Sequence, residues 1–204
     1  SYYDFVKDSS DVQVLTPTRK GGLGTASLNE LLQSVINPAM PARNERKFGS
    51  KTLREGDKVM QIRNNYRMEW RQLGRQSGRG VFNGDMGVIN TIDTDNAKVI
   101  VDFDGKFVTY DNEELDELEL AYAVTVHKSQ GCEFPAVIIP ISGFPPMLAT
   151  RNLLYTAITR GKKLVILVGS EERMQRMIDN NRIDERYTGL EDRLREIDLG
   201  RGLT

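Results

Sequence analysis

The sequence predicts an α/β fold built on a parallel sheet, with a small antiparallel β-barrel inserted into it. Near both ends of the chain, short apolar runs alternate with polar turns and amphipathic segments, which is typical of strands that alternate with helices. Between these regions lie short β-branched or aromatic runs separated by tight-turn sequences, which indicates an antiparallel meander. We expect residues 1–52 and 118–204 to form the discontinuous α/β part and residues 53–117 to form the barrel.

The first elements of the α/β part are a strand and a helix. Val12–Thr16 is an apolar, β-branched run, and a glycine-rich turn follows it. Ser27–Ile36 predicts a helix because Ser27 is a favoured N-cap residue and Glu30, three residues on, completes a capping box. The Asn-Pro pair after Ile36 ends this helix, because the residue before a proline avoids helical geometry.

The barrel is predicted from four strands with turn residues between them. These strands are Lys58–Ile62, Gly87–Asp93, Lys98–Phe103 and Lys106–Tyr110. Asp104-Gly105, between the last two, predicts a two-residue hairpin turn. Closure of so small a sheet removes its exposed edges, which favours a barrel over an open sheet.

The α/β pattern returns after Leu118. Three apolar runs predict strands, namely Leu120–Val126, Val137–Ile141 and Leu164–Val168. Helices are expected at Arg151–Thr159, Glu171–Asn181 and Leu190–Ile197.

Composition favours a soluble protein of the cytoplasm. The 204 residues are 39% hydrophobic and carry a net charge of −1. Cys132 is the only cysteine and there is one histidine, so neither an internal disulfide nor a zinc site of Cys and His is expected. No leader and no apolar run near the roughly 20 residues that span a bilayer is present, so no membrane contact is expected. The start, Ser1-Tyr2-Tyr3, is typical of a piece cut from a longer chain.

The charges are unevenly placed along the chain. Residues 43–79 are rich in Lys and Arg, whereas residues 102–119 are rich in Asp and Glu. A basic face is suited to phosphate, and the acidic run is interpreted as a solvated face that repels DNA.

Five segments carry the information about function. Thr125–Phe134 (TVHKSQGCEF) and Tyr155–Lys163 (YTAITRGKK) each join an apolar strand to hydroxyl, amide and cationic side chains that suit phosphates. Val14–Gly21, Gly56–Gln61 and Asn83–Gly87 precede them. The last two segments resemble the final two motifs of superfamily 1 helicases. The order of all five is similar to the C-terminal part of RecD-like bacterial DNA helicases.

The resemblance implies a second RecA-like motor domain with an inserted SH3-like barrel. The intact enzyme would be an ATP-dependent helicase that moves 5′ to 3′ on single-stranded DNA. The sequence has no Gly-x-x-x-x-Gly-Lys-Ser/Thr loop for the phosphates of ATP and no recognisable acidic residue for Mg²⁺. We therefore expect the N-terminal motor domain of the same chain to bind ATP and Mg²⁺. The fragment alone is expected to bind no cofactor and to hydrolyse no ATP.

The resemblance assigns the main catalytic role to Arg160. An arginine supplied across a domain interface stabilises the charge that develops on a transferred phosphoryl group. The ordinary alternative is a solvated arginine at a helix C-terminus, where the helix dipole favours a cation. Gly131, Glu133 and Arg19 are the nucleotide-binding candidates. Glu133 matches an acid that meets the ribose in related motors, and a simple turn acid would fit equally well.

Two segments are expected to hold single-stranded DNA through its phosphates. Hydroxyls, amides and backbone N–H groups grip such a strand without sequence preference. The candidate residues are Thr16, Thr18, Lys20, Thr125, His127, Ser129 and Gln130. Two structural alternatives stay open: His127 fixes its turn by a hydrogen bond, and Arg19 and Lys20 are solvated cations in a glycine turn.

In the barrel, Asn64, Tyr66 and Trp70 combine amide and aromatic side chains. Such a mixture suits base stacking next to phosphate contacts. The alternative is a long exposed hairpin whose Trp70 packs on the α/β domain.

A function of another class is also compatible with the sequence. The same fold can act as a non-catalytic DNA-docking or protein-interaction module, as the resemblance to the alpha chain of exonuclease V implies, with the other exonuclease V subunits as partners. An RNA-directed helicase is a second rival, because nothing in the sequence identifies a contact to the ribose 2′-hydroxyl.

Overall fold

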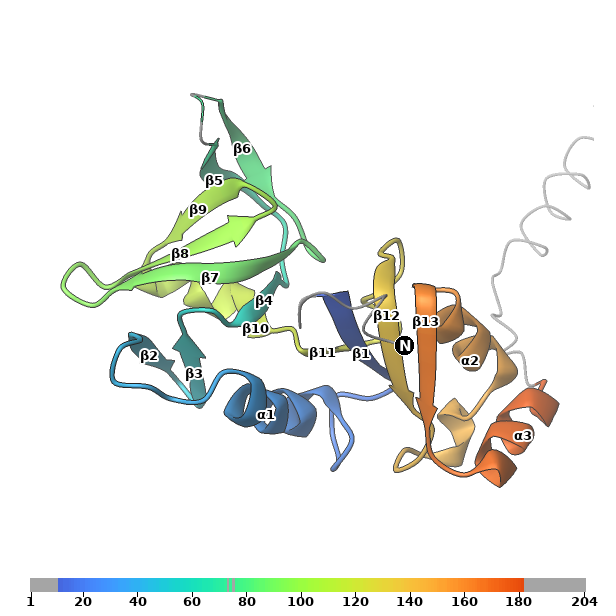
Figure 1. Cartoon of the computed structure of the whole chain (residues 1–204). Helices are drawn as coiled ribbons and strands as arrows, with labels where there is room; N and C mark the ends of the chain where they lie inside the picture. Colours follow the sequence, from blue (N-terminus) through green and yellow to red (C-terminus); the bar gives the residue numbers. More distant parts are fainter. Residues whose placement is uncertain (1–10, 73, 75, 182–204) are drawn as a thin grey trace, which may run out of the picture.

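A parallel sheet and a larger antiparallel sheet lie side by side in the computed structural model, which describes residues 11–72, 74 and 76–181 (Figure 1). The parallel sheet has the strand order β11-β1-β12-β13. Its strands are β1 (Val12–Thr16), β11 (Ala123–Thr125), β12 (Phe134–Pro140) and β13 (Gly161–Val168). Its helices are α1 (Thr25–Ile36), α2 (Arg151–Ile158) and α3 (Glu171–Asp179). The predicted α/β part is confirmed.

The direction of these strands defines two edges of the parallel sheet. Thr16 of β1 and Thr125 of β11 pair at the carboxyl edge, where both strands end. Phe134 of β12 and Gly161 of β13 pair at the opposite, amino edge, where both strands begin. The residues directly after β1 and β11 therefore lie far from those directly before β12 and β13.

Helix α1 begins earlier than the sequence predicts. Its N-cap is Gly24, so the predicted Ser27–Glu30 capping box is wrong. The preceding turn supplies the missing acceptors: the carbonyls of Thr18 and Arg19 accept hydrogen bonds from the first backbone N–H groups of the helix. The C-cap is Asn37, as the Asn-Pro pair predicts.

The inner face of α1 carries three buried amide side chains at helical spacing, Asn29, Gln33 and Asn37. Asn29 donates to the carbonyls of Leu120 and Ala123, at 2.8 and 2.9 Å, and so fixes the start of β11. Gln33 donates to the carbonyl of Thr52 at 2.8 Å. These bonds attach α1 to the segments on either side of the barrel.

The buried carboxylate of Asp57 lies at the junction of the two sheets. It accepts hydrogen bonds from Gln33 (2.5 Å), Asn37 (2.7 Å) and the hydroxyl of Tyr122 (2.9 Å). The backbone N–H of Arg54 donates a fourth, at 2.7 Å. Burial raises the pKa of Asp57, and the four hydrogen bonds act in the opposite direction. The Gly56–Gln61 segment thus has a structural role.

The antiparallel sheet has the order β10-β4-β7-β8-β9-β5-β6. Its strands are β4 (Lys58–Gln61), β5 (Asn65–Gln72), β6 (Ser77–Val81), β7 (Met86–Asp93), β8 (Lys98–Phe103), β9 (Lys106–Tyr110) and β10 (Leu118–Leu120). A separate hairpin, β2 (Glu45–Phe48) and β3 (Lys51–Arg54), precedes it. Short 3₁₀ turns span Asn112–Glu117 and Pro146–Leu148.

This sheet curls around its own core (Figure 1). Asp104 and Gly105 both have positive φ, 53° and 83°, which confirms the predicted two-residue hairpin turn. Within the described residues β6 and β10, at the ends of the sheet order, are not paired with each other, so the sheet is less closed than we expected.

Two hydrophobic cores result, one inside the curled sheet and one between the parallel sheet and its helices. Met60 of β4 is buried in the second core, although its strand belongs to the antiparallel sheet. The expected domain boundaries at residues 52/53 and 117/118 stay a prediction, and the predicted helix Leu190–Ile197 lies outside the described residues. None of the helices in the described ranges has the length and apolar character needed to cross a membrane.

Candidate functional site

The carboxyl edge of the parallel sheet brings together the two predicted DNA-binding segments. The backbone N–H of Val126 donates to the carbonyl of Thr16 at 3.0 Å, which joins the loop after β1 to the turn after β11. Thr16 is fully buried, and its hydroxyl donates to the carbonyl of Leu23 at 2.7 Å. Ser129 is also fully buried, and its hydroxyl donates to the carbonyl of Val126 at 2.8 Å. Both hydroxyls shape their loops instead of facing a ligand.

Other predicted residues of this edge are accessible. Lys20, His127 and Gln130 are exposed, and Thr18 and Thr125 are partly buried. The Thr125 hydroxyl accepts a 3.3 Å hydrogen bond from the backbone N–H of Lys128, and the Thr18 hydroxyl donates to the carbonyl of Lys20 at 2.8 Å. The imidazole of His127 has no hydrogen-bond partner among the described residues, so the turn is held by other groups.

The amino edge holds a second group, formed by Arg160, Glu133 and Gly131. Arg160 precedes β13, and its guanidinium donates to the carbonyls of Thr156 and Cys132, each at 3.2 Å. Glu133 is exposed and pairs with Lys162 at 2.8 Å, which lowers the pKa of Glu133. Gly131 has a φ of +86°, a conformation that a side chain rarely adopts.

Arg19 does not join this second group. It follows β1 and therefore lies at the carboxyl edge, whereas Glu133 and Arg160 precede β12 and β13. The two ends of β1, a five-residue strand, are about 13 Å apart, because each residue of a strand adds roughly 3.3 Å. The structure thus separates Arg19 from the other predicted nucleotide-binding residues.

The barrel places its predicted DNA-binding residues in different surroundings. Tyr66 is 69% exposed and packs edge-on against Phe82, with ring centroids 5.6 Å apart. The side-chain carbonyl of Asn64 accepts from the backbone N–H of Asn83 at 2.9 Å. Trp70 is partly buried and packs against the core of its own barrel, not on the α/β domain as the structural alternative expected. The ammonium of Lys106 lies 5.0 Å from the centre of the Trp70 ring.

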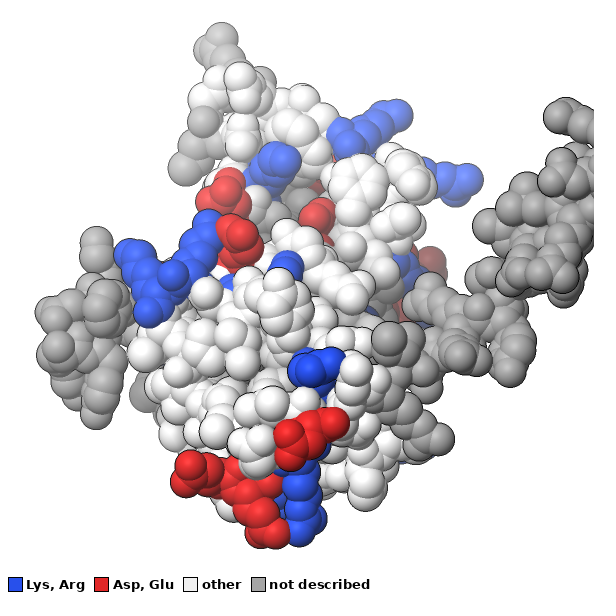
Figure 2. Space-filling model, turned by 90° about the vertical axis from the view of Figure 1, so that its right-hand side faces the viewer, with Lys and Arg blue, Asp and Glu red and all other residues white. Residues whose placement is uncertain are grey.

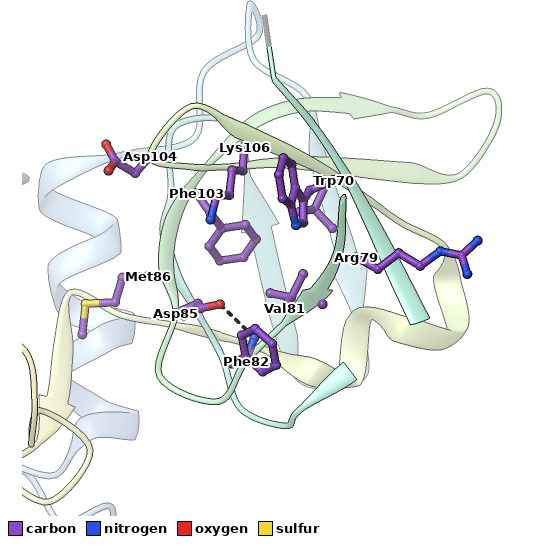
Figure 3. Close-up of a pocket in the computed structure, with 11 residues that line it drawn as sticks. Trp70, Arg79, Val81, Phe82, Asp85, Met86, Phe103, Asp104 and Lys106 are labelled. Atoms are coloured by element: carbon purple, nitrogen blue, oxygen red, sulfur yellow. Dashed lines mark hydrogen bonds between the residues drawn. The ribbon is translucent and has the colours of Figure 1, made fainter. Parts of the chain in front are cut away.

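A cavity of about 410 Å³ opens within the curl of the barrel (Figure 3). Trp70 and Phe103 point into it, whereas Arg79 points away (Figure 3). The backbone N–H of Phe82 donates to Asp85 at 2.8 Å and closes one side.

Part of the charge of the basic segment, residues 43–79, is neutralised by neighbouring acids. Several of its arginines pair with acids: Arg54 with Glu45, Arg63 with Asp116 and Arg79 with Glu69. On the side of the molecule where α2, α3 and β13 lie, charges of both signs are scattered between uncharged areas (Figure 2).

The amino edge offers one cation and one carboxylate to a ligand. These are the guanidinium of Arg160 and the carboxylate of Glu133. No group of three or more His, Cys, Asp or Glu side chains in the described ranges could hold a metal ion. Sequence reasoning missed Lys128 and Glu119, which meet at the carboxyl edge. For Lys128 there was one indication in the sequence, its place between His127 and Ser129, and for Glu119 there was none.

Comparisons with known proteins match both the barrel and the α/β part of this chain to helicase domains. A family model described as the ATP-dependent RecD-like DNA helicase SH3 domain matches residues 28–103, and the UvrD-like helicase C-terminal domain matches residues 120–168. The ATP-dependent RecD2 DNA helicase of Deinococcus radiodurans is 37% identical over 185 residues, which are 90% of this chain and 23% of the relative. The RecBCD enzyme subunit RecD of Mycolicibacterium smegmatis is 36% identical over 118 residues, 58% of this chain and 20% of the relative.

Solved structures share the fold. A structure of two coordinating Pif1 helicases at forked double-stranded DNA matches with a TM-score of 0.53 and 18% identity, over 94% of this chain and 45% of that chain. Bacteroides Pif1 bound to single-stranded DNA matches with a TM-score of 0.51 and 17% identity, over 94% and 45%. The chain spans about a quarter or less of the length of the two curated relatives, 23% and 20%. From its two matched domains and its 37% identity to a RecD2 helicase over 90% of its length, the chain belongs to the RecD-like family of DNA helicases.

Proposed function

We propose that this chain is the second motor domain, with its SH3-like insert, of an ATP-dependent helicase that moves 5′ to 3′ on single-stranded DNA. The observation that supports the proposal is the separation of two groups of polar residues at opposite edges of one sheet. In this proposal the loops after β1 and β11 are the DNA-binding edge, and the residues before β12 and β13 are the nucleotide-binding edge. ATP and Mg²⁺ would be held mainly by a motor domain outside these residues.

The turn Val126–Gly131 and the two residues after it connect the two edges directly. The turn begins next to Thr125, at the DNA-binding edge, and its continuation reaches the carbonyl of Cys132, which accepts a hydrogen bond from Arg160. Backbone hydrogen bonds from Ser129 to Thr125 (3.1 Å) and from Cys132 to Ser129 (3.0 Å) make the connection compact. A displacement of DNA at one edge can therefore be transmitted to Arg160 at the other.

Arg160 would act on ATP by stabilising charge in the transition state. A guanidinium has five N–H donors in a planar fork, and Arg160 uses three of its nitrogens on the acceptors of Thr156, Cys132 and Thr159. Bound ATP supplies a terminal phosphoryl group whose oxygens gain charge as it is transferred. The guanidinium has to exchange at least part of its present bonds for these oxygens, which favours an arginine that engages when the two motor domains close.

The test is the change Arg160→Ala in the full-length protein. We expect the DNA-stimulated ATPase rate to fall at least about a hundredfold with little change in nucleotide affinity, because a transition-state contact acts mainly on kcat. The measurement is steady-state ATP hydrolysis together with binding of a fluorescent ATP analogue.

Arg151→Ala is the matched control, since Arg151 is exposed at the other end of the same helix. This variant should keep near-normal turnover. An Arg160→Ala enzyme with normal kcat and weakened ATP binding would show that Arg160 only binds nucleotide.

A second candidate function is a non-catalytic docking subunit of an exonuclease V-type complex. The outer face of α1 favours it, because Leu31 and Val35 are 59% and 71% exposed on adjacent turns. The relative from Mycolicibacterium smegmatis is itself named as a subunit. An intact phosphate-binding loop upstream in the same reading frame, with ATPase activity of the whole protein, would decide for the motor.

A further inference from the structure

The carboxylate of Glu119 lies between two cations at the DNA-binding edge. One oxygen of Glu119 is 2.5 Å from the guanidinium of Arg19, and the other is 3.7 Å from the ammonium of Lys128. Arg19 belongs to the loop after β1, and Lys128 belongs to the turn after β11. A third cation, Lys51, interacts electrostatically with Glu119 and donates to the neighbouring carbonyl of Leu118 at 2.9 Å.

Glu119 differs in this respect from the rest of the acidic run. Asp116 pairs with Arg63 at 2.8 Å, and Glu117 accepts from Gln61 at 2.7 Å, both within the barrel. Asp111 and Glu114 cap the 3₁₀ turn with each other's backbone. The run was expected to repel DNA as a solvated face, but most of these carboxylates have structural partners. Glu119 alone among the described acidic side chains of the run contacts cations of the DNA-binding edge.

We propose that the Glu119 carboxylate occupies the position of a DNA phosphate in the free protein, and that a phosphate of single-stranded DNA displaces it. The inference rests on the proposed function and adds to it a phosphate subsite made by Arg19 and Lys128. A phosphodiester carries one negative charge and oxygen acceptors, as a carboxylate does, so the same two cations suit both. Glu119 stands on β10, so a strand of the barrel sheet supplies the competitor.

The geometry permits such an exchange. The side chain of Arg19 is 62% exposed, and those of Glu119 and Lys128 are each 28% exposed. Ion pairs that are open to water are weak, because both partners can be solvated again when they separate. The carboxylate therefore lowers DNA affinity at this subsite without blocking it.

The experiment measures the affinity of the full-length protein for fluorescent oligo(dT) over a range of salt concentrations. Glu119→Gln keeps the shape of the side chain and removes its charge. We expect about three- to tenfold tighter binding at low salt, because the phosphate no longer displaces an anion. The slope of log K against log salt concentration should become steeper by up to about 0.7. In the unmodified protein the released Glu119 carboxylate takes up a cation when DNA binds, and the variant has no such carboxylate. Lys128→Gln should weaken binding and make the slope shallower.

Asp116→Asn is the matched control. It removes the same charge at a position three residues from Glu119, and the ion pair that it breaks is a different one, with Arg63. An equal gain in affinity from Asp116→Asn would overturn the proposal in favour of a general charge effect. The proposal would also be overturned if Glu119→Gln gave no gain in oligo(dT) affinity. The same holds if Glu119→Gln gave an equal gain in a protein that already carries Arg19→Gln and Lys128→Gln. Tighter binding of a fluorescent ATP analogue without tighter oligo(dT) binding would assign the subsite to nucleotide instead. If the unmodified protein failed to bind oligo(dT) at all, the proposed function would fail first.

Discussion

Tyr66 and Trp70 stand four residues apart on β5, and their surroundings give them different tasks. The ring of Tyr66 is open to solvent with one edge contact to Phe82, so a base can stack on its free face. Trp70 lies over Gly78, where an added Cβ would come within 2.3 Å of the indole. The glycine opposite Trp70 is thus required by close packing inside the hairpin. Of the two residues, Tyr66 is suited to DNA and Trp70 to stability.

These different surroundings separate the effects of two substitutions. Tyr66→Ala should weaken binding of single-stranded DNA by about 1–3 kcal/mol and leave the melting temperature nearly unchanged. Trp70→Ala should lower the free energy of unfolding by about 2–3 kcal/mol, because a partly buried aromatic is lost from the barrel. Titration with oligo(dT) and urea unfolding measure the two effects. Equal loss of DNA affinity in both variants would contradict this division.

Residue types in the motifs could be recognised from the sequence, but the direction of each side chain could not. Thr16 and Ser129 have the hydroxyls that a phosphate site needs, yet both hydroxyls are satisfied by carbonyls inside their loops. Glu119 was grouped with its acidic neighbours because charge along the chain does not reveal that Arg19, a hundred residues earlier, is its partner. Such partners come from the tertiary fold.

At the scale of elements, the start of α1 is positioned by its packing against the preceding loop. A Cβ on Gly24 would lie 2.6 Å from the backbone of Arg19 and Lys20, so only glycine permits the loop to fold over the helix end. The carbonyls of this loop replace the side-chain cap that Ser27 was predicted to provide. The same contact places Arg19 at the DNA-binding edge.

Gly24→Ala should therefore affect both the helix and the loop. We expect the free energy of unfolding to fall by about 1–3 kcal/mol and DNA affinity to fall as Arg19 and Lys20 move. Gly22→Ala is the control, because nothing lies within 4 Å of a Cβ at that position. Urea unfolding and oligo(dT) titration are the measurements. Similar behaviour of the two variants would show that the close contact at Gly24 has no energetic importance.

The sequence predicted those elements whose signal is local. β1, β8 and β9 match their predicted bounds, because β-branched runs and the Asp-Gly turn specify them within a few residues. β5 and β6 were expected only as one alternative, a long exposed hairpin. Gly78 and Gly80 weaken the strand propensity of β6, and charged residues alternate with Tyr66 and Trp70 in β5, so pairing of β5 with β6 and with the more distant β9 defines the two strands. Most of the fold followed from the local pattern, whereas this hairpin did not follow from it alone.

At the scale of the whole molecule, the two sheets share residues and are not independent units. Met60 extends from the antiparallel sheet into the core of the parallel one. Three residues before it, Asp57 accepts hydrogen bonds from Gln33 of α1 and from the hydroxyl of Tyr122. Loss of either sheet would expose groups buried by the other.

We therefore expect the chain to unfold in one transition. Met60→Ala should lower the free energy of unfolding by about 2–5 kcal/mol and raise hydrogen exchange equally in β8 and β12, which belong to different sheets. Hydrogen–deuterium exchange with peptide resolution measures both. A rise confined to β12, with β8 still protected, would show that the barrel is stable by itself.

Helix α1 partly reverses the usual distribution of polarity on an amphipathic helix. Its amides Asn29 and Gln33 are buried beside Leu28, whereas Leu31 and Val35 face outward. Engineering this protein for solubility has to follow the same reversal. Charged residues at Leu31 and Val35 would be tolerated by the fold, while a leucine at Asn29 or Gln33, normally a conservative choice for an interior, would leave backbone carbonyls without donors and detach the helix.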